Sequence, residues 1–381
     1  MKAIFAIDSF KGSLTSFEAG HAASKGFLKV FPDADTVILP VADGGEGTTE
    51  ALTTGLGGTL HSVSVTDPTG DTVTATYGIS ADGVTCVMEM ASAAGLPLVP
   101  AEKRNPMYTT TYGVGEMIKD AISHGCRNFV IGIGGSATND CGIGMLSALG
   151  FLFCDIDGNV LSCGAADLGR IAYISQDNVI PELKDCSFNI ACDVKNPLCG
   201  EFGCSAVFAP QKGASSDDVI VMDGYFDTFA SLVKKYYPDS DKNYPGCGAA
   251  GGLGFAFRTF LGGKLLPGVE LVLDAVGLEE QLKDADIVFT GEGRLDLQTV
   301  MGKAPAGVSA LAEKYGVPVI AVSGCIGDGA GVCNEHGISA YFPILRNITT
   351  VEEAMKPEKA AENMTSTVEQ ITRLIKTFNK I

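Results

Sequence analysis

Tryptophan is absent from this sequence, aromatic residues make up only 8% of it, and there are four histidines. So few aromatic side chains argue against a surface that stacks sugars or nucleic-acid bases. Basic residues are scarce too: 27 lysines and arginines face 45 aspartates and glutamates, giving a formal net charge of -18 at pH 7. A surface this acidic repels phosphate backbones and anionic lipids, so we expect neither nucleic acid nor a membrane as partner. Basic residues inside glycine-rich segments are therefore informative.

No Cys-x-x-Cys pair occurs among the 12 cysteines, which are scattered through apolar segments. Cys192, Cys199 and Cys204 are the one cluster, and their spacing matches no common zinc pattern. We therefore expect reduced thiols in the core. The sequence also lacks a run of about 18 apolar residues, and Asp8 interrupts the first apolar run, so neither a membrane span nor a secretory signal is expected. These features predict a cytoplasmic protein.

What is present is a long and apolar chain. It has 381 residues, of which 46% are hydrophobic and 48 are glycine. That composition excludes a mainly disordered chain, and the length suggests two domains. The glycines follow no G-X-Y period, so they indicate loops between ordered elements rather than collagen.

The amino-terminal segment alternates strand and helix patterns. Residues 2–7 form a short apolar strand, and the capping box at 15–18 opens a helix to about Phe31. A second strand over 36–40 and a helix through Leu56 follow. This βαβα order is typical of a parallel α/β sheet.

The pattern then changes and later returns. Apolar and polar residues alternate over 63–77 around an Asp-Pro-Thr-Gly turn, which predicts a hairpin, and βα alternation resumes from Asp286. We therefore predict an α/β fold: a discontinuous Rossmann-like parallel-sheet domain from 1–62 plus 285–381, with an inserted second α/β domain, 63–284, containing a mixed sheet. The strand expected at 128–133 fits either domain.

Further elements are expected inside and after the insert. We predict helices over 111–125, 139–149, 216–236, 246–263, 304–315 and 357–378, and strands over 84–90, 188–192, 206–209, 287–290, 317–322 and 340–344.

Two dinucleotide-like glycine patterns are weak. Gly246–Gly251 matches G-x-G-x-x-G but follows Asn-Tyr-Pro instead of an apolar strand. Gly132, Gly134 and Ala137 do follow a strand, yet no acidic residue ends a next strand about 20 residues on. A Walker-type phosphate loop is absent as well. Nicotinamide binding is therefore disfavoured, and an oxidoreductase is kept only as an alternative.

Polar loops follow the predicted strands or precede the helices. In open α/β sheets ligands bind at the carboxyl ends of strands, so these loops are candidate site segments. Each also has a plain structural reading, as a capped turn, solvated acids, a helix N-cap or a surface ion pair. The loops are Asp8–Ser13, Asp43–Gly47, Gly134–Asp140, Asp193–Pro197 with Pro210–Gly213, and Gly291–Asp296 with Lys303.

The same segments carry a family resemblance. DSFKGSLTS, PVADGGEGT, GIGGSATNDCGIGML, ACDVKNPLCG with VFAPQKGA, PGCGAAGGLGFA, and DIVFTGEGRLDLQT with MGKAPAGV resemble the glycerate kinase family of the bacterial sugar-acid-degradation type. The resemblance implies ATP-dependent phosphorylation of D-glycerate with Mg²⁺, and two α/β domains with the site in the cleft between them. It favours 2-phosphoglycerate over 3-phosphoglycerate as product. A homodimer is left open.

Roles within those loops follow from the chemistry of phosphoryl transfer, which needs positioning and charge neutralisation. As catalytic residues we predict Asp193, or Asp8 in second place, as proton acceptor, together with Lys11. Glycerate-binding candidates are Ser9, Ser136, Thr138, Asn139 and Arg294. Phosphate or nucleotide candidates are Lys195, Lys212, Lys303, Gly291 and Gly293. Magnesium candidates are Asp43, Glu46, Glu292 and Asp296.

Histidine is not expected to act in catalysis, because none of the four lies in a motif loop. Besides the oxidoreductase, a non-catalytic sugar-acid sensor on the same fold is an alternative. A sensor would not need paired carboxylates beside lysines in several loops.

Overall fold

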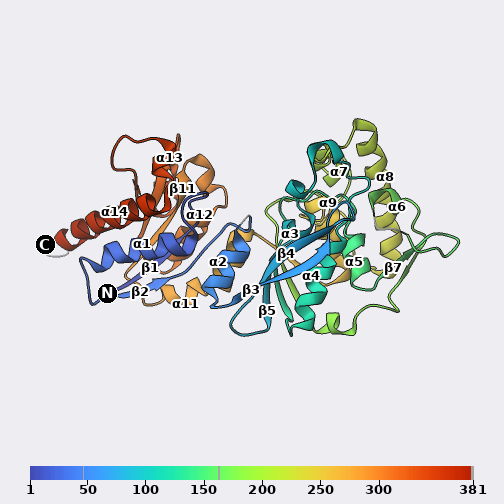
Figure 1. Ribbon diagram of the computed structural model, residues 1–381, viewed down its shortest axis with the longest axis horizontal. Coiled ribbons are helices and arrows are strands. Elements are labelled where there is room, and N and C mark those ends of the chain that lie inside the picture. Colours follow the sequence, from blue (N-terminus) through green and yellow to red (C-terminus); the bar gives the residue numbers. More distant parts are fainter. Residues whose placement is uncertain (46, 162–163, 379–381) are drawn as a thin grey trace. The chain divides into compact units, whose positions relative to one another are not determined.

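The computed structural model describes residues 1–45, 47–161 and 164–378 (Figure 1). The chain separates into two compact units. The terminal unit comprises Met1–Asp43, Glu50–Gly57 and Val269–Ile381, and the inserted unit comprises Gly44–Thr49 and Gly58–Gly268. No helix in the described part of the chain is long and apolar enough to cross a lipid bilayer.

The unit boundaries differ from the expected 62/63 and 284/285. They fall at 57/58 and 268/269. The first shifts because strand β3 (Thr59–Thr66) pairs with the hairpin strand β4 (Thr72–Ile79) in the inserted sheet. The second shifts because most of helix α10 (Gly268–Ala275) and all of helix α11 (Leu278–Leu282) belong to the terminal unit. Whether the two units fold independently as domains stays a prediction.

The terminal unit is built on a five-stranded sheet with the order β13-β12-β11-β1-β2. All four pairings are parallel, and Ile4 lies opposite Val288 on one side and Val37 on the other. The two ends of the chain therefore share one sheet. Its strands are β1 (Lys2–Ile7), β2 (Asp35–Ile38), β11 (Ile287–Leu295), β12 (Val319–Ile326) and β13 (Ile338–Pro343).

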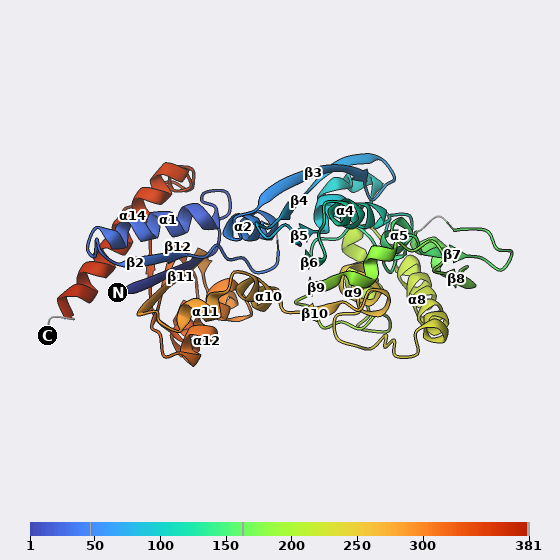
Figure 2. The ribbon, with the colours of Figure 1, turned by 90° about the horizontal axis from the view of Figure 1, so that it is seen from below.

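Helices cover both faces of this sheet (Figure 2). Helices α1 (Ser16–Leu28) and α14 (Pro357–Phe378) pack together on one face, where Phe5 and Phe289 stack with ring centroids 5.3 Å apart and Phe27 meets both edge-on. The opposite face carries α11 and α12 (Ala304–Lys314). The unit also holds most of α2 (Thr48–Gly55) and α10 (Gly268–Ala275), with α13 (Val351–Ala354) and 3₁₀ turns at Leu297–Val300 and Ala330–His336.

The amino terminus of α1 confirms the predicted capping box. Thr15 Oγ1 accepts the Glu18 N–H, and the Glu18 carboxylate accepts the Thr15 N–H. This reciprocal pair satisfies two donors that would otherwise lack a helical partner. The box therefore fixes where the chain leaves the loop that follows β1.

The inserted unit contains a six-stranded mixed sheet with the order β10-β9-β6-β5-β4-β3. The pairings from β10 to β5 are parallel, and those of β5 with β4 and β4 with β3 are antiparallel. The expected mixed sheet is confirmed, and the strand at 128–133 belongs to it as β6. The strands are β3, β4 (Thr72–Ile79), β5 (Thr85–Glu89), β6 (Asn128–Gly132), β9 (Ser187–Ala191) and β10 (Lys264–Leu266); β7 (Leu152–Cys154) and β8 (Tyr173–Ser175) form a separate pair.

Helices and short 3₁₀ turns complete the inserted unit. The helices are α3 (Ala91–Ala94), α4 (Tyr112–Ser123), α5 (Ile143–Ala148), α6 (Ala165–Leu168), α7 (Cys204–Phe208), α8 (Ser216–Tyr236) and α9 (Ala249–Phe260). The 3₁₀ turns are Leu96–Leu98, Ala101–Lys103, Pro181–Asp185 and Pro210–Lys212.

Cysteines lie mostly within the two cores, as expected. The 11 cysteines in the described residues are all free thiols, and Cys86, Cys126, Cys141, Cys204, Cys247 and Cys333 are buried. Cys154, Cys186, Cys192 and Cys199 are half-buried, and Cys325 is exposed.

Three local predictions were wrong. The helix expected from Asn139 begins only at Ile143, because Cys141 and Gly142 have φ angles of 52° and 72°, which break a right-handed helix. Residues 206–209, expected as a strand, lie largely in α7. The segment 291–295, expected as a loop, continues strand β11, because β12 supplies a parallel partner as far as Leu295. The predicted buried helix at 246–263 is present as α9, with a left-handed break at Ala250, Gly251 and Gly252.

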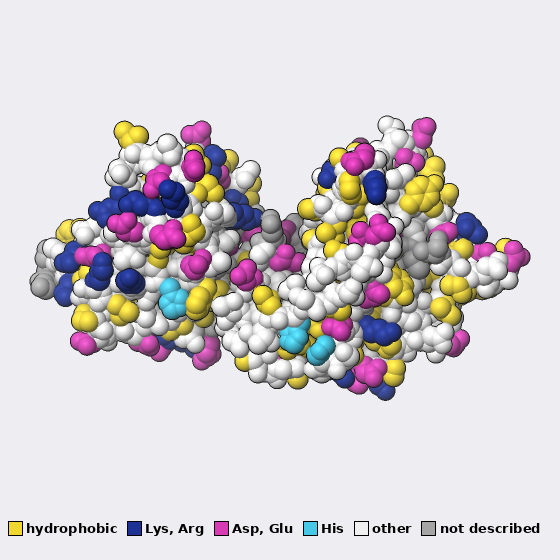
Figure 3. Space-filling model, in the orientation of Figure 1, with side chains coloured by type: hydrophobic (Ala, Val, Ile, Leu, Met, Phe, Trp, Pro, Cys, Tyr) yellow, Lys and Arg dark blue, Asp and Glu magenta, His cyan; other side chains and the backbone are white. Residues whose placement is uncertain are grey.

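Acidic and basic side chains are interspersed on the visible surface of the terminal unit (Figure 3). Some of these charges form ion pairs, such as Lys29 with Glu369 and Arg373 with Glu369, and the net charge of -18 is the excess of acidic residues. Such exposed pairs contribute little to stability individually.

Candidate functional site

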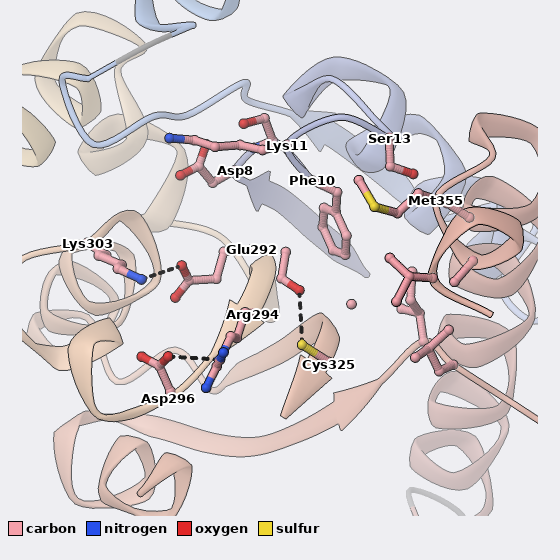
Figure 4. A pocket seen from close by; sticks show the side chains of 18 of the residues that line it. Asp8, Phe10, Lys11, Ser13, Glu292, Arg294, Asp296, Lys303, Cys325 and Met355 are labelled. Carbon is pink, nitrogen blue, oxygen red and sulfur yellow. Dashed lines mark hydrogen bonds and ion pairs between the residues drawn. The ribbon is translucent and has the colours of Figure 1, made fainter. Parts of the chain in front are cut away.

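A pocket of about 640 Å³ lies in the terminal unit, where β1 and β11 end (Figure 4). Its position follows the rule that ligands bind beyond the carboxyl ends of parallel strands. Nine of the residues predicted for the site line it: Asp8, Ser9, Lys11, Asp43, Glu292, Gly293, Arg294, Asp296 and Lys303. The loop Asp8–Ser13 and the end of strand β11 with Asp296 are far apart in the sequence and meet at this pocket.

Strand pairing places Asp8 at this pocket. The Asp8 N–H donates to the Gly291 carbonyl at 2.9 Å, and the Asp8 carboxylate accepts the Ser9 N–H at 2.6 Å. Ser16 Oγ donates to the Ile7 carbonyl at 2.5 Å and accepts the Val41 N–H at 2.9 Å. That one hydroxyl links the end of β1 to the segment after β2, which carries Asp43 into the same pocket.

Burial dominates the acidity of Asp8. Loss of hydration raises the pKa of Asp8 from 3.8 to about 7, and the negative charges of Asp43 and Glu292 act in the same direction. The Ser9 N–H and the Lys11 ammonium oppose this rise without cancelling it. Asp8 is therefore half-protonated near neutral pH, which suits a group that exchanges protons.

Glu292 and Lys303 form an ion pair beside Asp8. Glu292 is only 7% exposed, accepts a hydrogen bond of 2.7 Å from Thr299 Oγ1, and lies 3.2 Å from Lys303 Nζ. Desolvation raises the pKa of Glu292, while Thr299 and Lys303 act in the opposite direction. Strand β11 directs Glu292 into the pocket, because the strand continues five residues beyond the predicted end at Thr290.

Arg294 and Asp296 form the next pair along the same strand end. Arg294 Nε lies 3.1 Å from Asp296 Oδ2, and the Arg294 side chain is 63% exposed. The Asp296 carboxylate also caps the following 3₁₀ turn by accepting the Gln298 N–H at 2.9 Å. Asp296 is thus held in place, while most of the guanidinium stays open to a ligand.

The need for glycine at position 291 is explained by strand packing and not by ligand binding. A Cβ at this position would lie 2.0 Å from the Val322 carbonyl oxygen in the neighbouring strand. Gly291 is therefore required by the close pairing of β11 with β12, and it is not among the residues that line the pocket.

A second group of predicted residues lies in the inserted unit around Lys212. Lys212 is 2% exposed and donates hydrogen bonds to Ser136 Oγ at 2.7 Å and to the Thr138 carbonyl at 2.6 Å. Burial lowers the pKa of Lys212 from 10.5 to about 8. The buried ammonium therefore fixes the loop 134–140 through these two hydrogen bonds.

Asn139 points away from any open surface. It is fully buried, and its amide donates to Ser205 Oγ at 3.0 Å and to the Met222 sulfur at 3.2 Å. This placement does not support the predicted role of Asn139 in binding glycerate, because its amide donors are directed into the core. Thr138 is equally buried, and only its backbone carbonyl meets Lys212.

Asp140 organises this loop and was missed from the sequence. Its carboxylate is buried and accepts Thr111 N–H and Oγ1 at 2.8 Å each, Gly142 N–H at 3.1 Å and Gly144 N–H at 3.3 Å. Burial raises the pKa of Asp140, and these donors oppose the rise. The one sequence signal was its place at the end of the motif loop, two residues before Gly142.

The remaining predicted residues lie after β9 or outside the described chain. The Asp193 carboxylate accepts the Gly268 N–H at 2.8 Å, and Lys195 is exposed two residues later. Glu46, predicted as a metal ligand, lies outside the described residues. Over the residues the structure does describe, no group of three or more His, Cys, Asp or Glu side chains is arranged to hold a metal ion.

Comparison with known proteins identifies the family. The model of the glycerate kinase family matches residues 3–376. The chain belongs to the glycerate kinase family. It is 48% identical over 356 residues to "Glycerate 2-kinase" of Escherichia coli strain K12, covering 93% of each chain, and 44% identical over 375 residues to "Glycerate kinase" of Haemophilus influenzae, covering 98% of this chain and 99% of the relative.

A solved structure shares the whole fold. The crystal structure of a candidate glycerate kinase 2 from Salmonella typhimurium LT2 superposes with a TM-score of 0.92 at 41% identity, covering 100% of both chains. The resemblance inferred from the motif loops is therefore confirmed at the level of family and fold. In this member of the glycerate kinase family, the predicted site residues form two groups, one in each unit.

Proposed function

We propose that this chain transfers the γ-phosphoryl group of ATP to the 2-hydroxyl of D-glycerate, giving ADP and 2-phosphoglycerate. Family membership supports a glycerate kinase, and the E. coli relative, named a glycerate 2-kinase, supports the 2-position. The observation that carries the proposal is the pocket of the terminal unit. It gathers Lys11, Arg294 and Lys303 in a chain whose net charge is -18.

These cations suit the charge that moves during phosphoryl transfer. The transferred group carries negative charge on its three equatorial oxygens, and catalysis consists mainly of positioning and neutralising it. Lys303 is held by Glu292 and Arg294 by Asp296, so both cations are already oriented before a nucleotide binds. Preorientation reduces the cost of reorganisation during the reaction.

The pocket also fits a nucleotide-bound Mg²⁺. Mg²⁺ prefers carboxylate oxygens, keeps several waters and takes only one or two protein carboxylates when it arrives with phosphates. Asp43 and Asp296 line the pocket and are the carboxylates we propose for this contact, with Glu292 retained by Lys303 and Thr299. Bound there, Mg²⁺ would neutralise charge on the β- and γ-phosphates.

For the proton acceptor we propose Asp8 over Asp193. Asp8 lies in the pocket with a pKa of about 7, close to what a general base needs near neutral pH. Asp193 lies in the inserted unit, where its carboxylate already accepts the Gly268 N–H. Substituting each by asparagine separates the two assignments, because only the true base is needed for the chemical step.

For glycerate we propose Ser9 and Arg294, which line the pocket of the terminal unit, as ligands. Ser136 and Lys195 lie in the inserted unit, and their predicted contacts with glycerate and phosphate stay predictions. Ser136 Oγ is oriented by the Lys212 ammonium, so Lys212 acts here as a positioning residue and not as a phosphate ligand. Because ATP is the proposed co-substrate, we expect the protein in the cytoplasm.

The decisive experiment incubates the purified chain with ATP, Mg²⁺ and D-glycerate and measures ADP release. Coupling the reaction to enolase, without phosphoglycerate mutase, then shows which hydroxyl of glycerate has been phosphorylated, because enolase dehydrates only 2-phosphoglycerate. Enolase-dependent absorbance supports the 2-position, and ADP release without it assigns 3-phosphoglycerate. No turnover, with thermal stabilisation by glycerate alone, would instead support a sensor.

A further inference from the structure

The pocket of the terminal unit has a second half that phosphate chemistry does not use. Figure 4 shows Lys303, Glu292, Arg294 and Asp296 on one side of the pocket and Met355, with Phe10 and Cys325, toward the other. Ile344 and Leu345, from the end of β13 onward, complete this apolar half. The pocket is therefore charged at one end and mostly apolar at the other, where Ser13, Thr349 and Thr350 are the polar lining residues.

Burial distinguishes a floor and a rim in the apolar half. Phe10 and Ile344 are 4% and 3% exposed and form the floor, whereas Leu345 and Met355 are 37% and 40% exposed at the rim. A Cβ on Gly12 would lie 2.9 Å from Met355 Cε, which shows how closely Met355 covers the loop after β1. Apolar side chains therefore surround this half of the pocket.

Two glycines, Gly293 and Gly324, line the pocket where β11 and β12 lie side by side. A Cβ on Gly324 would lie 2.4 Å from the Gly293 carbonyl oxygen, and a Cβ on Gly293 would approach the Phe10 Cα at 3.7 Å. Neither strand therefore carries a side chain at this level of the pocket, since both residues lack one. The remaining space is bounded by backbone and by Phe10.

Of the two proposed substrates, only the nucleotide matches this arrangement. Glycerate is small and polar on every side, so it has no use for an apolar surface. ATP combines a flat apolar-faced base with a charged tail, and a pocket of about 640 Å³ lies within the usual range for small-molecule sites. We propose that the purine of ATP binds against Phe10, Cys325, Leu345 and Met355, with the triphosphate directed to Lys11, Arg294 and Lys303.

This inference rests on the proposed kinase function, but its first test does not require turnover. Cys325 is the exposed cysteine among those described, and it lines the apolar half of the pocket. Alkylation with N-ethylmaleimide, followed peptide by peptide with mass spectrometry, reports whether a ligand covers it. The half-buried Cys154 and Cys186 of the inserted unit serve as internal controls.

We expect saturating Mg²⁺–ADP to slow labelling of Cys325 at least tenfold and to leave Cys154 and Cys186 unchanged. D-glycerate alone should not protect Cys325. Unchanged labelling of Cys325 under nucleotide saturation, in protein that still phosphorylates glycerate, would overturn the base site and leave the kinase function standing. Protection by ADP without any glycerate turnover would keep the nucleotide site and reject the proposed function.

A variant separates the base from the triphosphate. Met355→Asp places a charge in the apolar half, so we expect the KM for ATP to rise at least tenfold and the KM for glycerate to change less than twofold. Inhibition by tripolyphosphate, which has no base, should stay unchanged. An unaltered KM for ATP, or an equal loss of tripolyphosphate inhibition, would overturn the proposal.

The matched control is Leu374→Asp, which adds the same charge at an exposed apolar residue of α14 that does not line the pocket. It should leave both KM values unchanged. If circular dichroism shows that Met355→Asp is misfolded, Leu345→Asp provides the same test from the other side of the rim.

Discussion

The Lys212 ammonium lies 2.6 Å from the Thr138 carbonyl oxygen, entirely inside the inserted unit. The contact joins the last residue of the 3₁₀ turn Pro210–Lys212 to the loop 134–140, and a second hydrogen bond reaches Ser136. A buried ammonium is costly unless its donors are satisfied. These two hydrogen bonds therefore indicate that Lys212 fixes the conformation of the loop 134–140.

Replacing Lys212 by methionine should lower the free energy of unfolding. Lys212→Met keeps the aliphatic stem but leaves Ser136 Oγ and the Thr138 carbonyl without their donor, so we expect a loss of about 2 kcal/mol in urea unfolding. The same change at exposed Lys195 should be nearly neutral. Equal effects at both positions would contradict the positioning role.

The pH dependence of stability gives an independent check on Lys212. Its pKa is about 8 in the folded chain and 10.5 when unfolded, so the unfolded state binds more protons between these values. Stability contributed by this group therefore rises with pH from about 8 to 10.5. Unfolding measured across that window should lose this rise in Lys212→Met.

Asp8 has the opposite dependence. Its pKa is about 7 folded against 3.8 unfolded, so the folded state binds more protons and the contribution of Asp8 falls as pH rises from about 4 to 7. Above pH 7 the ionised carboxyl costs up to roughly 4 kcal/mol, reduced to on the order of 2 kcal/mol by partial exposure. Asp8→Asn should therefore raise Tm at pH 8 and flatten its pH profile.

The same variant tests the proton acceptor. We expect Asp8→Asn to lower kcat at least about a hundredfold, since general base catalysis contributes roughly 100- to 10,000-fold. The pH profile of kcat/KM should have an acidic limb near 7 in the unmodified protein. A larger loss in Asp193→Asn than in Asp8→Asn would return the role to Asp193.

Lys11 is exposed at the pocket, so its removal should spare the fold. Because an electrostatic donor to the transition state is worth about 3–4 kcal/mol, we expect Lys11→Ala to lower kcat about a hundredfold or more. Lys11→Met keeps the stem and should lose as much, which separates charge from packing. Near-normal turnover in both would shift the phosphate role to Arg294 and Lys303.

Gly26 allows helices α1 and α14 to approach. A Cβ there would lie 2.3 Å from the Thr365 carbonyl oxygen, so Gly26→Ala should destabilise the chain by about 2 kcal/mol in denaturant unfolding. Gly224 in α8 has open space around its Cα, so Gly224→Ala should instead stabilise by about 0.5–1 kcal/mol. Stabilisation by both changes would show that α1 can move away from α14.

Local sequence patterns determined the elements whose stability is local. The strand at Lys2–Ile7, the capping box at Thr15 and the helices at Ser216–Tyr236 and Pro357–Phe378 occur where they were expected. Caps and apolar periodicity act over a few residues, so the elements that depend on them can be predicted without knowledge of the tertiary structure. The motif loops, too, identified the family and half of the residues that line the pocket.

Tertiary packing decided what those patterns could not. Strand β11 runs on through Glu292 only because β12 pairs with it, and Cys141 adopts a left-handed φ of 52° where its N–H bonds to the Gly251 carbonyl. Side-chain direction was decided the same way: Asn139 turns into the core and Lys212 is buried, although both lie in polar motif loops. The sequence determined which residues were available for chemistry, whereas partners distant in the chain determined where each one points, because hydrogen bonds and burial are satisfied only in the folded chain.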